Sequence, residues 1–121
     1  MSARIPIRIR IEEFGELEGE LIRFYAPLTV RELLGMLPIS GAIALWSYAI
    51  YFQIPLSRGA EKPVRRVKPG DILYWPPGEC IVLAFAEADP PAQATKIGEF
   101  KGDYGKLRSI RPGARISISR A

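Results

Sequence analysis

One apolar segment, residues 70–85, constrains the fold of this chain more than any other. It reads Gly-Asp-Ile-Leu-Tyr-Trp-Pro-Pro-Gly-Glu and continues as Cys-Ile-Val-Leu-Ala-Phe. Pro77 fixes φ for the first corner of a turn, and Gly78 is expected to supply the positive φ of the next corner. The sequence therefore predicts a β-hairpin with strands at about 71–75 and 80–85. The second strand is apolar on both faces, as expected for a strand central to a closed or covered sheet.

Several other short segments also have strand character. Ile5, Ile7, Ile9 and Ile11 alternate with polar residues or proline, which predicts a first strand with one buried face. Further strands are expected at about 16–24, with a bulge at Gly19, and at about 42–46, 49–54, 95–100 and 114–119. The charged segment 57–69 and the segment 87–94 are expected to be loops. About eight short strands favour a β-barrel or sandwich, because closure removes exposed strand edges.

One short helix is predicted after the second strand. Thr29-Val30-Arg31-Glu32 fits a capping box, in which the threonine and the glutamate satisfy each other's backbone N–H groups. Leu33, Leu34 and Leu37 continue the helical spacing that Val30 begins, and Pro38 ends it. We expect the apolar face of this helix to cover an open end of the barrel or sheet.

Composition narrows the classes of protein that this chain can belong to. Its 121 residues, 48% of them hydrophobic, predict a single domain over 1–121. No apolar run approaches the roughly 20 residues that span a bilayer, so a soluble cytoplasmic protein is expected. The single cysteine and the absence of histidine exclude an internal disulfide, a Cys/His zinc site and an imidazole base. No metal or cofactor is predicted. The lack of asparagine and the many prolines and arginines indicate a thermophilic source.

The helix start and the hairpin also resemble a known family. Ala26-Pro27-Leu28-Thr29 looks like the step into the helix that caps the barrel of cyclophilins. Tyr74-Trp75-Pro76-Pro77-Gly78, with Tyr51-Phe52-Gln53-Ile54-Pro55 upstream and Gly102-Asp103 downstream, is similar to a group of small prokaryotic proteins of unknown function with a cyclophilin-like barrel. The resemblance implies a mainly β fold, a closed barrel of about eight strands with one short capping helix.

The same resemblance argues against prolyl isomerase activity. Cyclophilins isomerise prolyl bonds with an arginine in a Phe-His-Arg step, aided by aromatic residues, a glutamine and a histidine. This chain has no histidine, and its segment 39–54 contains no arginine. Gln53 lies beside aromatic residues, but in a different local pattern. No catalytic residue is therefore predicted.

The predicted site is a groove lined by aromatic residues of the two hairpins. Its candidate ligand-binding residues are Trp46, Tyr51, Phe52, Gln53, Tyr74, Trp75 and Glu79. Ordinary core packing is the alternative for each aromatic residue. Cys80 is expected to be a small buried residue with a protonated thiol. Asp71 and Glu79 have the residue types of an acid/base pair, although a turn hydrogen bond is the simpler role for Asp71.

Three functional hypotheses follow from this pattern. The first is a protein without isomerase activity that binds a small molecule or an extended peptide in the groove. The second is an enzyme, either a weak prolyl isomerase or a relative of amide hydrolases with similar barrels. The third is a structural subunit, such as a homodimer, that works through its surface. Nucleic-acid binding is not favoured, because the basic residues near the end of the chain are spread over turns without interleaved aromatic residues.

Overall fold

The first strand confirms the alternation in the sequence. The computed structural model describes residues 3–121, and β1 (Arg4–Ile11) buries its four isoleucines while it exposes the residues between them. β1 pairs with β2 (Gly15–Ile22) from Arg4 opposite Ile22 to Ile11 opposite Gly15, with no shift in register. The bulge that we predicted at Gly19 is therefore wrong. The position has no room for a side chain, because a Cβ added to Gly19 would lie 2.9 Å from the Glu99 carbonyl oxygen.

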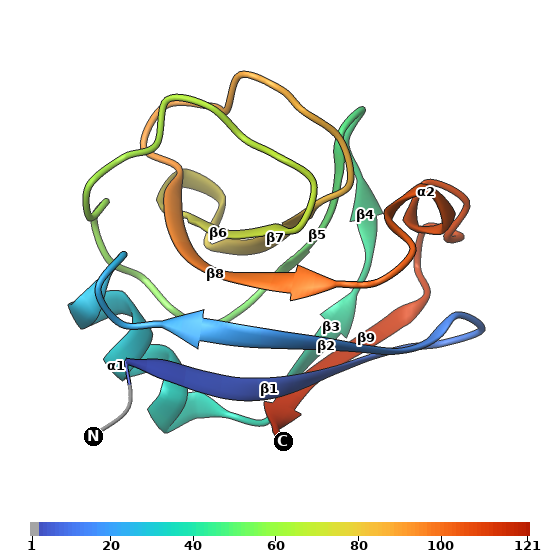
Figure 1. Ribbon diagram of the computed structural model, residues 1–121, viewed down its shortest axis with the longest axis horizontal. Coiled ribbons are helices and arrows are strands. Elements are labelled where there is room, and N and C mark those ends of the chain that lie inside the picture. Colours follow the sequence, from blue (N-terminus) through green and yellow to red (C-terminus); the bar gives the residue numbers. More distant parts are fainter. Residues whose placement is uncertain (1–2) are drawn as a thin grey trace.

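Within residues 3–121, nine antiparallel strands form one sheet that wraps into a nearly closed barrel (Figure 1). The order across the sheet is β3-β9-β1-β2-β8-β6-β7-β5-β4. Besides β1 and β2, the strands are β3 (Ile39–Ala42), β4 (Ala44–Leu45), β5 (Ala49–Gln53), β6 (Asp71–Trp75), β7 (Cys80–Ala84), β8 (Thr95–Lys101) and β9 (Arg115–Arg120). This mainly β architecture confirms the predicted fold class.

The barrel closes where the chain passes from one edge of the sheet to the other. The strand predicted at 42–46 is in fact two strands, β3 and β4, joined by Ile43. β3 pairs with β9, and β4 pairs with β5. The Ile43 N–H donates to the Ala114 carbonyl oxygen at 2.9 Å, and the Gly113 N–H donates to the Ile43 carbonyl oxygen at 2.8 Å. These bonds continue the pairing of β3 with β9 by one residue, to the point where the chain enters β4.

The helix α1 (Pro27–Met36) contributes its apolar face to the interior of the barrel. Val30, Leu33 and Leu34 are buried in the same cluster as the isoleucines of β1. The predicted capping box is wrong, because the helix begins earlier, with Ala26 as its N-cap residue. A residue far along the chain satisfies the first turn instead. Oε1 of Glu61 accepts hydrogen bonds from both the N–H and the hydroxyl of Thr29, each at 2.7 Å.

The hairpin of β6 and β7 has the predicted strands and a different turn. A 3-10 turn, η1 (Pro76–Gly78), connects the strands, and the positive φ of 51° belongs to Glu79. The expectation that Gly78 would supply it is wrong. Gly78 is small because the Trp75 ring lies over it, so that an added Cβ would lie 2.7 Å from ring carbons. All five residues of β7 are buried, as predicted for a covered central strand.

The one irregularity in strand pairing that the structure describes lies between β6 and β8. Ile72 is opposite Gly98 whereas Leu73 is opposite Lys96, so Ile97 is the extra residue of a bulge. β8 ends at Lys101, and the short helix α2 (Tyr104–Leu107) follows it, with Asp103 as its N-cap residue.

A second apolar cluster lies outside the barrel. Its buried residues are Ala49, Val67, Leu73, Val82, Ala84 and Ala94. They come from the outer face of β5, β6 and β7 and from the two long loops, 57–69 and 86–94, which arch over these strands at the top of Figure 1. The Val67 N–H donates to the Ala88 carbonyl oxygen at 2.9 Å and so joins the loops. Within the described residues, no helix is long and apolar enough to cross a membrane.

Candidate functional site

Three half-buried aromatic side chains, Trp46, Tyr51 and Trp75, meet on the outer face of the barrel and form an aromatic patch. Trp46 follows β4, Tyr51 lies in β5 and Trp75 ends β6. The Trp46 ring centroid lies 4.4 Å from that of Tyr51 and 5.4 Å from that of Trp75. The two indoles are nearly perpendicular, at 81°, which is the edge-to-face geometry that aromatic pairs favour. The patch is continuous with the second apolar cluster.

Hydrogen bonding differs among the three rings of the patch. Trp75 is held by a hydrogen bond of 3.1 Å from its Nε1–H to the Ala92 carbonyl oxygen. Among residues 3–121, neither the Trp46 Nε1–H nor the Tyr51 hydroxyl has a hydrogen-bond partner. The ring of Tyr48 lies 5.8 Å from that of Trp46, and its hydroxyl is buried without a partner in the described structure. Burial raises the pKa of Tyr48. Polar groups are therefore available beside an apolar surface.

Gln53 lies at the border of the aromatic patch, and Glu79 follows the turn that the Trp75 ring covers. Gln53 is exposed and opposite Cys80, which is opposite Trp75, so the three residues form one row across β5, β7 and β6. Neither the Gln53 amide nor the Glu79 carboxylate has a hydrogen bond or ion pair with residues 3–121. Burial and the nearby Glu79 charge raise the pKa of the Cys80 thiol. Cys80 is thus buried and protonated, as predicted.

Phe52 and Tyr74 lie on the opposite face of the sheet from the aromatic patch. They are 1% and 0% exposed and pack among the interior residues of the barrel. Each is next in sequence to a patch residue, and adjacent strand residues face opposite sides of a sheet. The Tyr74 hydroxyl donates to the Leu56 carbonyl oxygen, and burial raises its pKa. The structure therefore brings four of the seven predicted residues, Trp46, Tyr51, Gln53 and Trp75, to one surface. It places Phe52 and Tyr74 in the core, the alternative that the sequence left open, and Glu79 at the end of the turn between β6 and β7.

Asp71 and Glu79 do not form an acid/base pair. Asp71 begins β6 whereas Glu79 follows the turn after its other end, and a five-residue strand spans roughly 13 Å between its end residues. Asp71 accepts a hydrogen bond of 2.9 Å from the Lys68 N–H, which confirms its predicted turn role. Its carboxylate also pairs with Lys96 at 3.1 Å.

The sequence analysis missed the ionic cluster around Lys96. This amine contacts the carboxylates of Asp71 at 3.1 Å and Glu99 at 2.8 Å, and it lies 4.5 Å from the Tyr25 ring centroid. Burial disfavours the charged amine, but the hydrogen bonds and charges of the two carboxylates outweigh it and raise the pKa of Lys96. The bulge at Ile97 puts Lys96 and Glu99 on one face, and no local sequence signal showed that bulge. A lysine held so firmly in its charged form is unsuited to act as a base or nucleophile.

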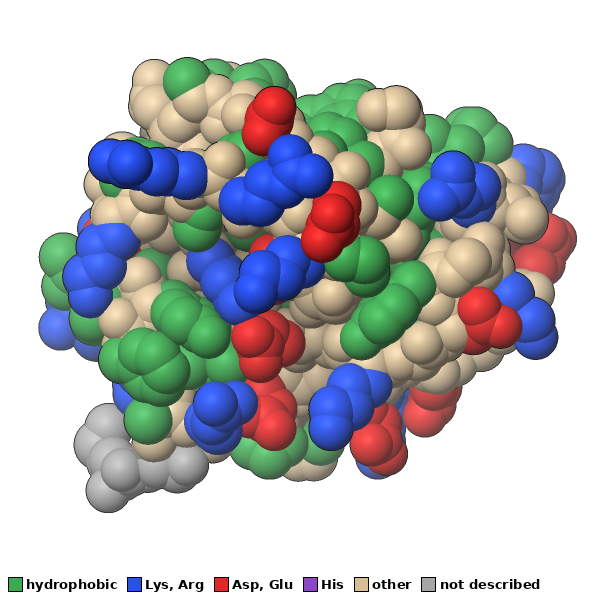
Figure 2. All heavy atoms as spheres, turned by 45° about the horizontal axis from the view of Figure 1, so that its top comes forward, with side chains coloured by type: hydrophobic (Ala, Val, Ile, Leu, Met, Phe, Trp, Pro, Cys, Tyr) green, Lys and Arg blue, Asp and Glu red, His purple; other side chains and the backbone are tan. Residues whose placement is uncertain are grey.

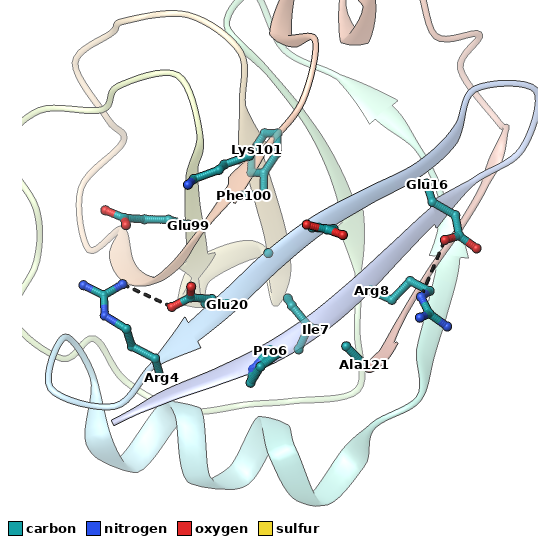
Figure 3. Close-up of a pocket in the computed structure, with 12 residues that line it drawn as sticks. Arg4, Pro6, Ile7, Arg8, Glu16, Glu20, Glu99, Phe100, Lys101 and Ala121 are labelled. Carbon is teal, nitrogen blue, oxygen red and sulfur yellow. Dashed lines mark hydrogen bonds and ion pairs between the residues drawn. The ribbon is translucent and has the colours of Figure 1, made fainter. Parts of the chain in front are cut away.

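A polar groove of about 540 Å³ crosses the outer side of β1, β2 and β8, away from the aromatic patch (Figure 3). Ion pairs occupy its walls, including Arg4 with Glu20 at 3.1 Å and Arg8 with Glu16 at 3.5 Å. Basic and acidic side chains are likewise interspersed over the face in Figure 2. Exposed pairs of this kind contribute little to stability. Within residues 3–121, no group of three or more acidic or cysteine side chains is placed to hold a metal ion.

Comparison with known proteins identifies the family. A model described as Cyclophilin-like matches residues 5–119. The solution structure of the hypothetical protein AF2241 from Archaeoglobus fulgidus is similar over 100% of this chain and 98% of that chain, with a TM-score of 0.78 and 30% identity. The structure of McbB in complex with tryptophan is similar over 94% of this chain and 44% of that chain, with a TM-score of 0.73. At 15% sequence identity, the similarity to McbB shows only that the two proteins share a fold. No curated protein matches. This chain belongs to the cyclophilin-like family.

Proposed function

We propose that this protein is a binding protein whose aromatic patch holds a small molecule or an extended peptide. The observation that carries the proposal is the contact of Trp46 with both Tyr51 and Trp75 on a partly exposed surface. Aromatic pairs contribute about 0.5–1.5 kcal/mol beyond the area they bury, so a ligand ring on this patch gains more than it would on an aliphatic surface.

Free polar groups around the patch support a specific ligand. Binding sites combine apolar walls with a few polar groups that fix the ligand's orientation. The Trp46 Nε1–H, the Tyr51 hydroxyl and the Gln53 amide are unpartnered in residues 3–121 and suit this role. McbB, a protein of the same fold, is described in complex with tryptophan. Indoles and aromatic amino acids are therefore the first compounds to test.

We also propose that the protein has no prolyl isomerase activity. Arg58 is the first arginine after the helix, and it forms an ion pair of 2.9 Å with Glu32. Only 17% of its side chain is exposed, so it is not free to contact a prolyl bond. The chain also lacks the histidine of the cyclophilin pattern. A protease-coupled assay is expected to show no acceleration of prolyl isomerisation. An isomerisation rate that rises with the concentration of this protein would overturn the proposal that it lacks isomerase activity.

Isothermal titration calorimetry tests the binding proposal, because indole ligands emit in the same range as the two tryptophans of the patch and would mask their fluorescence. Indoles, aromatic amino acids and short extended peptides are titrated against the wild type and against Trp46→Leu and Trp75→Leu. We expect saturable binding that each variant weakens. Glu18→Gln is the matched control, because Glu18 is exposed on β2 and outside the patch. The absence of any saturable ligand, or equal binding by both patch variants, would overturn the proposal.

The composition supports a cytoplasmic protein of a thermophilic organism as the setting for this function. Scarce amides and proline-rich loops are typical of proteins that work at high temperature. Thermal unfolding monitored by circular dichroism tests the thermophilic origin, and a transition in the range of ordinary mesophilic domains would contradict it.

A further inference from the structure

We infer that Gly78 is a positioning residue of the aromatic patch, because it leaves the space in which the Trp75 ring is held against Trp46. This role rests on the proposed function, since Trp75 is one of the three rings that are proposed to contact the ligand. A side chain at position 78 would change the shape of the binding surface from below, at a residue that is not itself part of the patch.

The backbone of the turn does not require glycine at position 78. Glycine is favoured where φ is positive, and the positive φ in this turn, 51°, belongs to Glu79. Gly78 has no positive φ and ends the 3-10 turn η1, a conformation that other residues adopt readily. The surroundings of Gly78, and not its backbone conformation, therefore exclude a side chain.

Two neighbouring side chains occupy the space into which a side chain at position 78 would extend. A Cβ added to Gly78 would lie 2.7 Å from two ring carbons of Trp75, Cε3 and Cζ3, and 2.8 Å from Sγ of Cys80. Cys80 is buried, and its thiol donates to the Gly78 carbonyl oxygen at 3.2 Å. The Trp75 ring is half-buried and is the easier of the two to displace. An alanine methyl at this position would thus push the ring away from the turn.

A loop holds the same ring from its other end. The Trp75 Nε1–H donates to the Ala92 carbonyl oxygen at 3.1 Å, and the turn 91–94, closed by a backbone hydrogen bond of 3.3 Å, fixes that acceptor. With its six-membered ring over Gly78 and its N–H on the loop, Trp75 lies 5.4 Å from Trp46 at an angle of 81°. Displacing the ring from Gly78 therefore disturbs both the hydrogen bond and the contact between the two indoles.

Gly78→Ala should move the Trp75 ring while the barrel stays folded. The NMR signal of the Trp75 indole N–H should shift, and this proton should exchange faster with solvent, because its bond to Ala92 is lost. Two indoles in contact also couple their electronic transitions, and the resulting pair of bands in the circular dichroism spectrum should weaken, as in Trp46→Leu. Gly59→Ala is the matched control, because Gly59 is a loop glycine without a positive φ and an added Cβ there meets nothing within 4 Å. An unchanged Trp75 signal in Gly78→Ala would overturn the inference.

A double-mutant cycle separates the ring from the turn as the reason for the glycine. Gly78→Ala is made in the wild type and in Trp75→Leu, whose side chain lacks the ring carbons above Gly78. We expect Gly78→Ala to lower the urea midpoint of the wild type and to change that of Trp75→Leu much less, because residues in contact are energetically coupled. Equal losses in both backgrounds would show that the turn or Cys80, and not the ring, requires the glycine, and would overturn the inference.

Binding measurements connect Gly78 to the proposed function. In calorimetric titrations with tryptamine, an indole, Gly78→Ala should bind roughly twofold to twelvefold more weakly than the wild type, the factor that one aromatic contact contributes. Gly59→Ala should bind as the wild type does. If Gly78→Ala binds tryptamine as tightly as the wild type although its Trp75 signal has moved, the positioning role fails and the binding patch stands. If the wild type binds none of the indoles, aromatic amino acids or peptides, the proposed function fails and the positioning role fails with it.

Discussion

Replacing Glu61 should destabilise the protein although this residue is far from any predicted site. Its carboxylate accepts three hydrogen bonds from the first turn of α1, from the Leu28 N–H at 3.2 Å and from the N–H and hydroxyl of Thr29 at 2.7 Å. It therefore replaces the N-cap side chain that the helix lacks, and it fastens the loop 57–69 to the helix.

The size of the effect follows from these bonds. Loss of a helix N-cap costs about 1 kcal/mol, and leaving a buried hydroxyl such as that of Thr29, which is 0% exposed, without a partner costs about 1–3 kcal/mol. Glu61→Ala should thus lower the free energy of unfolding by about 2–4 kcal/mol. At an unfolding entropy of about 2.1 cal/mol/K per residue, 3 kcal/mol lowers the Tm of a chain of this length by roughly 12 °C. Glu61→Gln keeps one acceptor oxygen and should have a smaller effect.

The pH dependence gives a second readout of the same contact. Burial works against the charged carboxylate, but its hydrogen bonds from Thr29 and Leu28 and the charge of Arg58 outweigh burial and lower the pKa of Glu61. A lowered folded pKa contributes stability that is fully present above the ordinary value near 4.5 and is lost as the pH falls through the folded pKa. The stability difference between wild type and Glu61→Gln should therefore shrink below about pH 4.5. Glu99 also has a lowered pKa, mainly because of its hydrogen bond from Lys96. Its contribution to the pH dependence is the same in both proteins and cancels in this difference.

Urea unfolding followed by circular dichroism at several pH values measures both quantities. Glu18→Ala serves as the control, because this exposed residue has no ion pair within residues 3–121 and should change stability by less than about 0.5 kcal/mol. If Glu61→Ala behaved like that control, or if the difference between wild type and Glu61→Gln were constant from pH 7 to pH 3, the capping role would be refuted.

The remaining predictions concern packing. Gly98→Ala should lower the free energy of unfolding by more than about 3 kcal/mol, because the added Cβ would clash with the Glu20 carbonyl oxygen. Gly35→Ala in α1 meets open space and should stabilise the protein by about 0.5–1 kcal/mol. A pair of thermal melts compares them, and equal Tm values would contradict the strand geometry. Tyr48→Phe removes a buried hydroxyl that has no partner in the described structure, so urea unfolding should show unchanged or higher stability. A loss above about 1 kcal/mol would show that the hydroxyl is bonded.

Periodicity in the sequence was sufficient to predict most of the elements. The isoleucines of β1 and the breaks at prolines and glycines gave the strands and the helix within a few residues. The wrong capping box and the missed bulge have a common cause, which is interaction between distant segments. Thr29 had the sequence of a cap, but Glu61, 32 residues later, supplies the acceptor. Similarly, the bulge at Ile97 depends on how β6 and β8 pair, and neither strand shows it alone.

The sequence predicted only part of the candidate site, and the reason is similar. Alternation places Tyr51 and Phe52 on opposite faces of β5, but it does not say which face lies inside when a strand is apolar on both sides. The contact of Trp46 with Trp75 joins two segments more than 20 residues apart in the chain, which a single sequence does not specify. The cluster around Lys96 left no local signal at all.

The most direct test of the binding patch uses the two indole N–H resonances of the protein, which come from Trp46 and Trp75. Heteronuclear NMR spectra are recorded during a titration with tryptamine, and Trp46→Phe assigns the two signals. Within residues 3–121 the Trp46 Nε1–H has no hydrogen-bond partner, whereas that of Trp75 donates to the Ala92 carbonyl oxygen, so we predict a saturable shift that is larger for Trp46. Unchanged indole signals, with shifts confined to the groove of β1, β2 and β8, would contradict the proposal that the aromatic patch is the binding site.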